Sequence, residues 1–468
     1  MSAEISAQNE QIIAEQYGFA DKVKPLIQSR FDHTPLAFIH TYGCQQNVSD
    51  SEKLKGWLEY IGFDFCEEPD NADLVLFNTC AVREHAEARV FGNIGALKKF
   101  KKARPNMLIC LCGCMPQQNE VSEKVKKSYP YVDIVFGTGL RHKFPELLYK
   151  KLISDKRVFD NTLDAKIYEG IPVKRDGTFK TWLPIMQGCN NFCTYCVVPY
   201  VRGREHSRTP EAVIAEAKEL IESGAKEIML LGQNVNSYGK GEEHGVDFAD
   251  LLKMVNDLEG DFRLRFMTSH PRDCTEKLLK TMRDCDKVCK CLHLPVQSGS
   301  DRVLKEMNRH YDTAHYLSLI EKARELMPDI EFTSDIIVGF PGETREDFEK
   351  TLDLVKKVKY RALFTFIFSP RRNTPAEKME DPIPKEQKSA WFTELLRVQD
   401  EISKEHEKTL IGKMVCVLCE EEKGGIVSGK DEAGANIFFK GTADMIGKFQ
   451  NVVIEDVSSG IMGKIKEN

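Results

Sequence analysis

The chain has 468 residues, 41% of them hydrophobic and 29% charged, which is typical of a soluble globular protein with about three domains. Its polar N-terminus excludes a secretory signal, and no apolar stretch approaches the roughly 20 residues of a membrane helix, so no membrane partner is expected. The net charge of −6 argues against avid non-specific binding to nucleic acids, and fifteen cysteines without a signal indicate a cytoplasmic, metal-binding protein rather than a disulfide-bonded one.

The first part of the chain predicts an N-terminal extension followed by an α/β domain. Residues 1–34 lack a regular hydrophobic period and are expected to be partly helical or disordered. In residues 35–152, short apolar runs alternate with longer segments that suit helices, which predicts a doubly wound parallel sheet. The expected strands are Ala37–His40, Leu74–Phe77, Met107–Leu111 and Val132–Phe136.

A cysteine follows each of the first three expected strands, at Cys44, Cys80 and Cys114. Successive strands of a parallel sheet end at the same edge, so the three thiols should converge there. We expect them to bind an iron–sulfur cluster, called the second cluster because another cysteine trio, Cys189, Cys193 and Cys196, lies further along the sequence. The alternative is that each is a small buried hydrophobic residue, as cysteine often is. Cys110 and Cys112 share a strand face with Cys114, but Cys114 leaves the strand after a glycine and is the expected ligand.

The middle of the chain predicts a linker and then a barrel. Residues 155–175 are rich in Asp, Lys and Gly and are expected to be a linker. Residues 175–405 contain six apolar runs separated by helical segments, which predicts a partial (βα)6 barrel, because a complete barrel has eight such units. The expected strands are Leu183–Met186, Ile228–Leu231, Leu264–Met267, Val288–Leu294, Phe332–Val338 and Leu363–Phe368.

The most informative segment follows the first of these strands, where Cys189, Cys193 and Cys196 have the spacing Cys-x3-Cys-x2-Cys. Three local thiolates can hold a [4Fe–4S] cube and leave one iron open. An open metal position indicates catalysis rather than a structural role. The alternative is a zinc site, for which His206 is the nearest further ligand.

The last part of the chain, residues 408–468, predicts a small antiparallel β-barrel, a fold that often binds nucleic acid. Its expected strands are Met414–Leu418, Gly425–Ser428, Ile437–Phe439, Val452–Ile454 and Ile461–Ile465. The cysteines outside the two trios are expected to be structural: Cys66, Cys274, Cys285, Cys289, Cys291, Cys416 and Cys419.

The motifs resemble those of one enzyme family. The loop with Cys189, Cys193 and Cys196 resembles the signature of radical S-adenosylmethionine enzymes. The other cysteine trio resembles the N-terminal domain of the methylthiotransferases, and the tail is similar to the TRAM domain that ends them. Nearly everything after residue 35 fits, including the segments Leu231–Asn236, Thr268–Pro271, His293–Ser300 and Gly339–Thr344.

The resemblance implies an enzyme that methylthiolates C2 of N(6)-isopentenyladenosine next to the anticodon of tRNA. It implies two [4Fe–4S] clusters and S-adenosylmethionine, with Cys189, Cys193 and Cys196 on the catalytic cluster and the second cluster supplying or carrying the sulfur. The implied partners are tRNA, a one-electron reductant protein and a sulfur donor, and nothing demands more than a monomer.

Polar residues at or near the expected strand ends are candidates for contact with S-adenosylmethionine: Tyr195, Gln233, Ser269, Gln297, Ser298 and Asp335. Arg202 and Arg204 follow the cysteine loop and are candidates for binding a carboxylate or an RNA phosphate, because arginine suits both.

Three other functions remain open at the level of the sequence. The first is a methylthiotransferase that acts on threonylcarbamoyl-adenosine in tRNA or on a ribosomal-protein aspartate. The second is an electron carrier with two clusters and no catalysis, for which a barrel of this size would be excessive. The third is an RNA-binding protein whose clusters are only structural.

Overall fold

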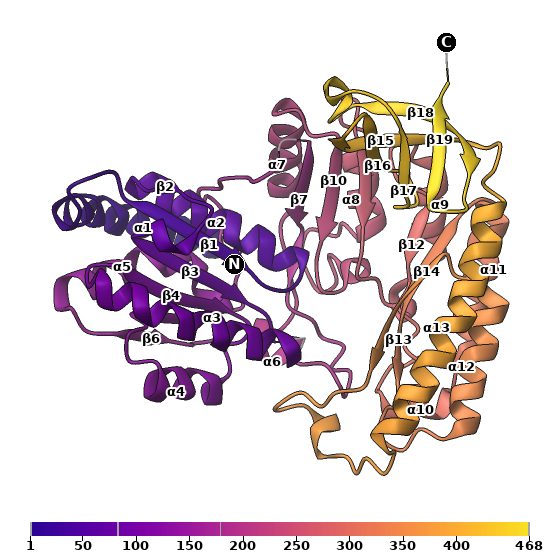
Figure 1. Ribbon diagram of the computed structural model, residues 1–468, viewed down its shortest axis with the longest axis horizontal. Coiled ribbons are helices and arrows are strands. Elements are labelled where there is room, and N and C mark those ends of the chain that lie inside the picture. The colour runs from indigo at the N-terminus through magenta and orange to yellow at the C-terminus, as the bar shows by residue number, and fades with distance from the viewer. Residues whose placement is uncertain (1, 82–83, 178, 467–468) are drawn as a thin grey trace.

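A computed structural model describes residues 2–81, 84–177 and 179–466, and Figure 1 shows three units in chain order. A parallel sheet with helices on both faces is followed by a curved run of strand–helix units and a small closed barrel. This arrangement confirms the expected α/β fold class. Within the described residues, no helix is both long and apolar enough to cross a membrane.

The N-terminal sheet has six parallel strands in the order β2-β1-β3-β4-β5-β6. The strands are β1 (Leu36–Thr41), β2 (Asp64–Phe65), β3 (Leu74–Thr79), β4 (Leu108–Gly113), β5 (Ile134–Gly137) and β6 (Val158–Asp160). β3 and β4 are buried along their whole length because helices cover both faces, which explains their continuous apolar runs. Residues 155–175, the expected linker, include an edge strand of this sheet, β6, which pairs with β5.

Two helical layers enclose the sheet over separate apolar cores, as a doubly wound fold requires. Helices α1, α2 and α5 cover one face, and α3 and α4 cover the other. The helices are α1 (Ser2–Arg30), α2 (Gln45–Ile61), α3 (Glu84–Ala103), α4 (Asn119–Ser128) and α5 (Phe144–Ser154), with short 3-10 helices η1 (Pro69–Asn71) and η2 (Thr138–Lys143).

The N-terminal segment, expected to be an extension, forms the long helix α1 on this sheet. Its residues Ala20, Val23 and Ile27 are fully or almost fully buried in the same core as Trp57 of α2. Burial of these apolar side chains stabilises the helix, so most of the segment is an ordered part of the N-terminal layer.

The central unit has six parallel strands that lie side by side in chain order, which confirms the partial (βα)6 barrel. A bridge between Leu264 and Val288 joins its two halves. The strands are β7 (Lys180–Pro184), β10 (Glu227–Leu231), β11 (Arg263–Phe266), β12 (Cys291–His293), β13 (Glu331–Val338) and β14 (Ala362–Ile367).

Helices pack on the outer face of these strands around the largest apolar core. They are α7 (Pro210–Glu222), α8 (Phe248–Asn256), α9 (Glu276–Asp284), α11 (Thr313–Leu326), α12 (Arg345–Val358) and α13 (Lys385–Lys408). The short helix α10 (Asp301–Glu306) packs in a separate small cluster with Phe340 and Phe368. Thr209 caps α7, and Thr344 forms a capping box with Asp347 at the start of α12. Short elements in the connections are β8 (Met186–Gln187), α6 (Val198–Arg202), β9 (His206–Ser207), η3 (Val235–Ser237), η4 (Pro271–Asp273) and η5 (Pro375–Lys378).

The C-terminal unit is a closed barrel in the strand order β15-β16-β17-β19-β18. Its elements are β15 (Met414–Lys423), β16 (Ile426–Lys430), β17 (Asn436–Lys440), η6 (Ala443–Met445), β18 (Phe449–Asp456) and β19 (Ile461–Ile465). The expected barrel is confirmed with one correction. β17 and β19 pair in parallel, because β18 lies between them in the chain and runs antiparallel to β19.

The closed barrel docks at the amino ends of the central strands. Lys180 at the start of β7 donates to Glu420 at 2.8 Å, and Arg263 at the start of β11 donates to the carbonyl of Lys430 at 2.9 Å. Sites in parallel α/β folds lie at the carboxyl ends of the strands, so the closed barrel leaves that end of the central unit open.

Candidate active site

The loop after β8 carries the Cys-x3-Cys-x2-Cys sequence at the carboxyl edge of the central strands. Gly188 has φ +81°, and a Cβ there would lie 1.9 Å from the carbonyl oxygen of Arg204, so only glycine fits. The Cys189 N–H donates to the carbonyl of Gly203 at 3.2 Å. Phe192 adopts a left-handed φ of +48°, which the Asn308 amide stabilises by donating to its carbonyl at 3.0 Å. The backbone is thereby folded tightly around the thiols.

The far side of the loop is fixed to two other segments. Thr194 donates its N–H to Met307 O at 3.1 Å and its hydroxyl to Glu306 O at 2.9 Å. Ala376 donates to Thr194 O at 2.9 Å. These bonds hold the loop rigidly, which a site that positions reactive groups requires.

A buried arginine lies against this loop. Arg309 is 4% exposed, and its Nη1 lies 3.4 Å from Cys193 Sγ and 3.5 Å from the Tyr195 hydroxyl. Cys189 and Cys193 are also buried, and burial raises the pKa of Cys189 to about 11. A guanidinium beside sulfur ligands stabilises negative charge there. The loop therefore suits an anionic metal–thiolate group, and sequence reasoning missed Arg309 because it lies more than a hundred residues away.

The second cysteine trio lies at the carboxyl edge of the N-terminal sheet, directly after β1, β3 and β4. Gly43 has φ +113°, and a Cβ on it would lie 2.4 Å from Cys80 Cβ. Gly113 has φ +102°, and a Cβ on it would lie 2.3 Å from the carbonyl oxygen of Thr79. The two glycines thus let the first and third loops close against the second, where parallel strands end together.

Hydrogen bonds from two buried amide side chains connect these loops. Asn47 Nδ2 donates to the carbonyls of Tyr42 at 2.9 Å and Thr79 at 3.1 Å. Asn78 Nδ2 donates to Asn47 O at 2.8 Å and to Ser51 Oγ at 3.0 Å. Sequence reasoning missed this network, although the polar run at the start of a helix that faces the core was a signal for it.

Gly113→Ala is expected to disturb this edge of the sheet selectively. The new methyl group would strain a left-handed residue by roughly 1–2 kcal/mol and push against the Thr79 carbonyl. We therefore expect a lower Tm and loss of the iron bound near Cys114, measured by thermal unfolding and iron assay. Gly95→Ala is the control, because Gly95 lies exposed in α3 with open space around its Cα. It should raise helix stability by about 1 kcal/mol and leave iron unchanged. Full iron content in Gly113→Ala would contradict this account of the edge.

The loop that carries Cys114 and the segment that follows Cys196 share a boundary. Cys114 packs in one apolar cluster with Val197 and Val201, which leave the other cysteine loop through α6, and Ala81 packs beside them. Thr138 in η2 donates its hydroxyl to Val201 O at 2.5 Å. Figure 1 shows α6 at the junction of the sheet and the central barrel. Two sulfur-rich loops from separate units therefore meet across one short helix.

A single metal ion would need several donor side chains close together. Among the side chains that the structure describes, no three of His, Cys, Asp or Glu lie close enough to hold one metal ion. A four-iron cube is larger than one ion, so its thiolates stand further apart. The zinc alternative is disfavoured, and its extra ligand, His206, is exposed and pairs through β9 with Gln187.

The expected S-adenosylmethionine residues gather mostly at the mouth of the central barrel. Ser269 Oγ is buried without a hydrogen-bond partner among the described residues, as a site for a polar ligand would leave it. Gln297 donates its N–H to Asp335 O at 2.8 Å, and Asp335 Oδ1 lies 3.6 Å from His293 Nε2. Gln233 instead accepts from the Gly188 N–H at 2.5 Å and so holds the cysteine loop.

Two of the expected contacts are contradicted. Ser298 is fully buried, accepts from the Ser300 N–H at 3.2 Å and lies 3.4 Å from the Thr351 hydroxyl of α12. It therefore braces a helix outside the barrel and is not placed to touch a ligand. Arg202 is 2% exposed and pairs with Asp50, so it is not available to an RNA phosphate. Arg204 is exposed, with its guanidinium 4.4 Å from the ring centroid of Phe192.

The cysteine loop and the partial barrel that carries it define the class of protein, a radical S-adenosylmethionine enzyme. Residues 183–355 match the Radical SAM superfamily, and residues 37–137 match the Uncharacterized protein family UPF0004. The radical S-adenosylmethionine methyltransferase TsrM from Kitasatospora setae has a similar fold, with a TM-score of 0.53 at 13% identity over 85% of this chain and 81% of that chain.

Sequence similarity over nearly the full length of the chain identifies one family within this class. The tRNA-2-methylthio-N(6)-dimethylallyladenosine synthase of Clostridium beijerinckii is 49% identical over 94% of this chain and 98% of its own. The synthase of the same name from Thermoanaerobacter sp. is 50% identical over 91% of each. The chain belongs to the family of tRNA-2-methylthio-N(6)-dimethylallyladenosine synthases.

Proposed function

We propose that this chain methylthiolates C2 of N(6)-isopentenyladenosine next to the anticodon of tRNA by radical S-adenosylmethionine chemistry. The observation that carries the proposal is the meeting of two cysteine trios across α6, in a chain about 50% identical to synthases named for this product. The same relatives favour this substrate over threonylcarbamoyl-adenosine or a ribosomal-protein aspartate.

Two [4Fe–4S] clusters and S-adenosylmethionine are the cofactors. We assign one cluster to Cys189, Cys193 and Cys196 and the other to Cys44, Cys80 and Cys114. When bound, the first supplies the electron that cleaves S-adenosylmethionine, and the second carries or supplies the sulfur. A one-electron reductant protein and a sulfur donor are therefore partners that the chemistry demands. A tRNA substrate, together with a chain that carries fifteen cysteines, suits the reducing cytoplasm.

The chain itself contributes placement and exclusion of water. Arg309 holds negative charge at Cys193, and Gln233 fixes the backbone of the loop through Gly188. We assign Tyr195, Ser269, Gln297 and Asp335 to orienting S-adenosylmethionine at the barrel mouth. The apolar side chains of Val197 and Val201 beside Cys114 keep water away from the boundary between the trios, which protects reactive intermediates.

The substrate side of the site is aromatic and basic. Phe364 and Phe366 of β14 are 46% and 44% exposed, and the Phe364 ring lies 5.6 Å from His293 beside Asp335. Exposed aromatic faces suit stacking on an unpaired base and packing of its isopentenyl chain. We assign Arg204 and the C-terminal barrel to the tRNA backbone, which arginine recognises well.

Nucleoside mass spectrometry of tRNA from cells that lack this chain tests the proposal. We expect methylthio-isopentenyladenosine to disappear and isopentenyladenosine to accumulate. Returning the wild-type gene should restore the product, and the Phe364→Ala gene should restore only part of it. Unchanged methylthio-isopentenyladenosine in the deletion strain would exclude the proposed function.

A further inference from the structure

One buried arginine reaches from the central unit into the second cysteine site. Arg202 ends α6, is 2% exposed, and crosses to the N-terminal sheet, where its Nη2 donates to Asn47 Oδ1 at 2.7 Å and Asp50 Oδ2 at 2.9 Å. Both acceptors lie on α2, within two turns of Cys44. A side chain of one unit is thereby fixed beside the ligands carried by the other.

The other terminal nitrogen of this guanidinium has no visible acceptor. Arg202 Nη1 is buried and lacks a hydrogen-bond partner in the part of the chain that the structure describes. Leaving such a charged donor unsatisfied is costly, so an acceptor is expected at this position. The neighbouring candidates are sulfur atoms. Asn47 Oδ1, which accepts from Arg202 Nη2, also accepts from Cys44 Sγ at 3.7 Å, and Cys114 packs against Val201, the residue before Arg202.

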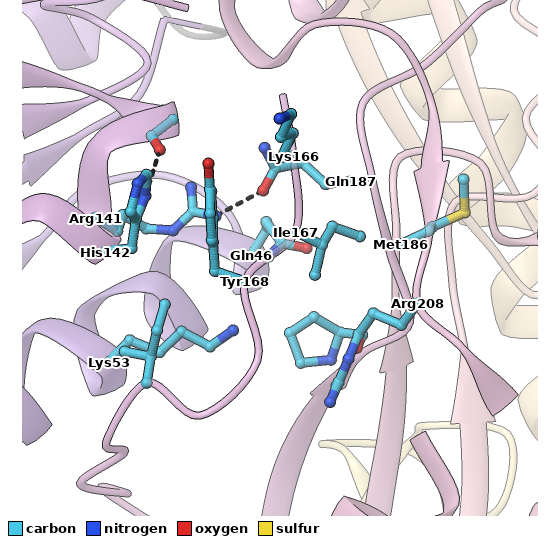
Figure 2. Close-up of a pocket in the computed structure, with 13 residues that line it drawn as sticks. Gln46, Lys53, Arg141, His142, Lys166, Ile167, Tyr168, Met186, Gln187 and Arg208 are labelled. Carbon is cyan, nitrogen blue, oxygen red and sulfur yellow. Dashed lines mark hydrogen bonds between the residues drawn. The ribbon is translucent and has the colours of Figure 1, made fainter. Parts of the chain in front are cut away.

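Arg202 is the last residue in a connected series of buried polar side chains. Asp50 is 3% exposed, and its Oδ1 lies 3.2 Å from Nε of Arg141. Arg141 in turn donates from Nη2 to Gln187 Oε1 at 2.6 Å, a bond drawn in Figure 2. Gln187 stands two residues before Cys189. These contacts therefore connect the start of the loop of Cys189 with the surroundings of the second trio.

The charges of Arg202, Asp50 and Arg141 do not cancel on their own. Two guanidinium groups, Arg141 and Arg202, share the single carboxylate of Asp50, whose pKa they lower although burial acts in the opposite direction. Buried ion pairs are stable only when charge is compensated and hydrogen bonds are complete. An anionic cluster held by thiolates would supply both the missing charge and the missing acceptor.

We propose that Arg202 is a positioning residue for the second cluster, donating from Nη1 to its sulfur ligands while Asp50, Arg141 and Gln187 hold it in register with the catalytic loop. This inference rests on the proposed assignment of Cys44, Cys80 and Cys114 to that cluster. Hydrogen bonds and positive charge at cluster sulfurs raise its reduction potential, so loss of Arg202 lowers the potential.

The test uses the full chain with Cys189, Cys193 and Cys196 replaced by alanine, so that only the second cluster is read by iron assay and EPR redox titration. If this parent chain binds no iron, the proposed cluster assignment fails, independently of Arg202. With iron present, Arg202→Gln should shift the potential to more negative values, and Arg202→Lys should shift it less. In the otherwise wild-type chain, Arg202→Gln should lower methylthiolation about 10–100-fold while cleavage of S-adenosylmethionine continues.

Arg263→Gln is the matched control, because Arg263 is also a buried arginine, paired with Glu227 at 2.8 Å at the opposite end of the central strands. It should lower Tm without moving the potential. An unchanged potential and EPR signal in Arg202→Gln would overturn the inference. If Arg202→Gln does not fold, Arg202→Lys decides, since an unshifted potential there contradicts a bond from the arginine to sulfur.

Discussion

Replacing Cys189 by alanine is expected to abolish reductive cleavage of S-adenosylmethionine and, with it, all methylthiolation. Cys189 is one of the three cysteines of a loop that the tight turn at Gly188 and several backbone bonds hold in place. Two thiolates hold a four-iron cube poorly, because such a cluster usually takes four ligands. The measurement is 5′-deoxyadenosine formed anaerobically from S-adenosylmethionine and a strong reductant, with tRNA binding followed in parallel.

Cys66→Ala is the control for this experiment. Cys66 is a partly exposed cysteine beside β2, and its thiol contacts only the carbonyl of Glu68 at 3.4 Å among the hydrogen bonds of the described chain. Its loss should leave 5′-deoxyadenosine formation unchanged. Wild-type cleavage in Cys189→Ala would contradict the catalytic assignment. Simultaneous loss of folding and tRNA binding would instead support a cluster with a purely structural role.

Replacing Cys114 by alanine is expected to separate the two halves of the reaction. S-Adenosylmethionine should still be cleaved, because the loop of Cys189 is intact, whereas methylthiolation should fall below detection. The reason is that the second cluster loses one of its three ligands. Products are measured as 5′-deoxyadenosine and as methylthio-isopentenyladenosine in one reaction, so a selective loss of the second is read directly.

A neighbouring cysteine provides the control. Cys112 lies in β4, two residues before Cys114, but packs into the apolar core beneath α1, α2 and α5, and burial raises its pKa well above the usual range. Cys112→Ala should lower Tm through a small cavity and keep both the iron and the methylthio product. If Cys112→Ala lost the product while Cys114→Ala retained it, the ligand assignment would be wrong.

The repeating strand–helix pattern made the two larger units predictable. In a parallel sheet covered on both faces, strands are continuous apolar runs, and Leu74–Thr79 and Leu108–Gly113 show this directly. The convergence of Cys44, Cys80 and Cys114 on one edge followed from the same topology. Because that topology fixes where strands end, residues at strand ends could be placed without knowing any contact in advance.

Features that depend on distant partners were not predictable in this way. Arg202 belongs to a basic run that looked like a substrate contact, but its burial depends on Asp50, which lies 152 residues away in the sequence. The parallel pairing of β17 with β19 depends on how a barrel closes. Helix α1 has weak periodicity of its own and is stabilised by packing on α2 and α5.

The most direct test of the account is an iron count with Mössbauer spectroscopy after anaerobic reconstitution. The wild-type chain should hold about eight irons, because each [4Fe–4S] cube contains four. The Cys189/Cys193/Cys196 and Cys44/Cys80/Cys114 alanine variants should each hold about half of that, as a single cluster with the spectrum of the remaining site. A wild-type chain that holds only one cluster, or a variant that loses both at once while still folded, would contradict two independent sites.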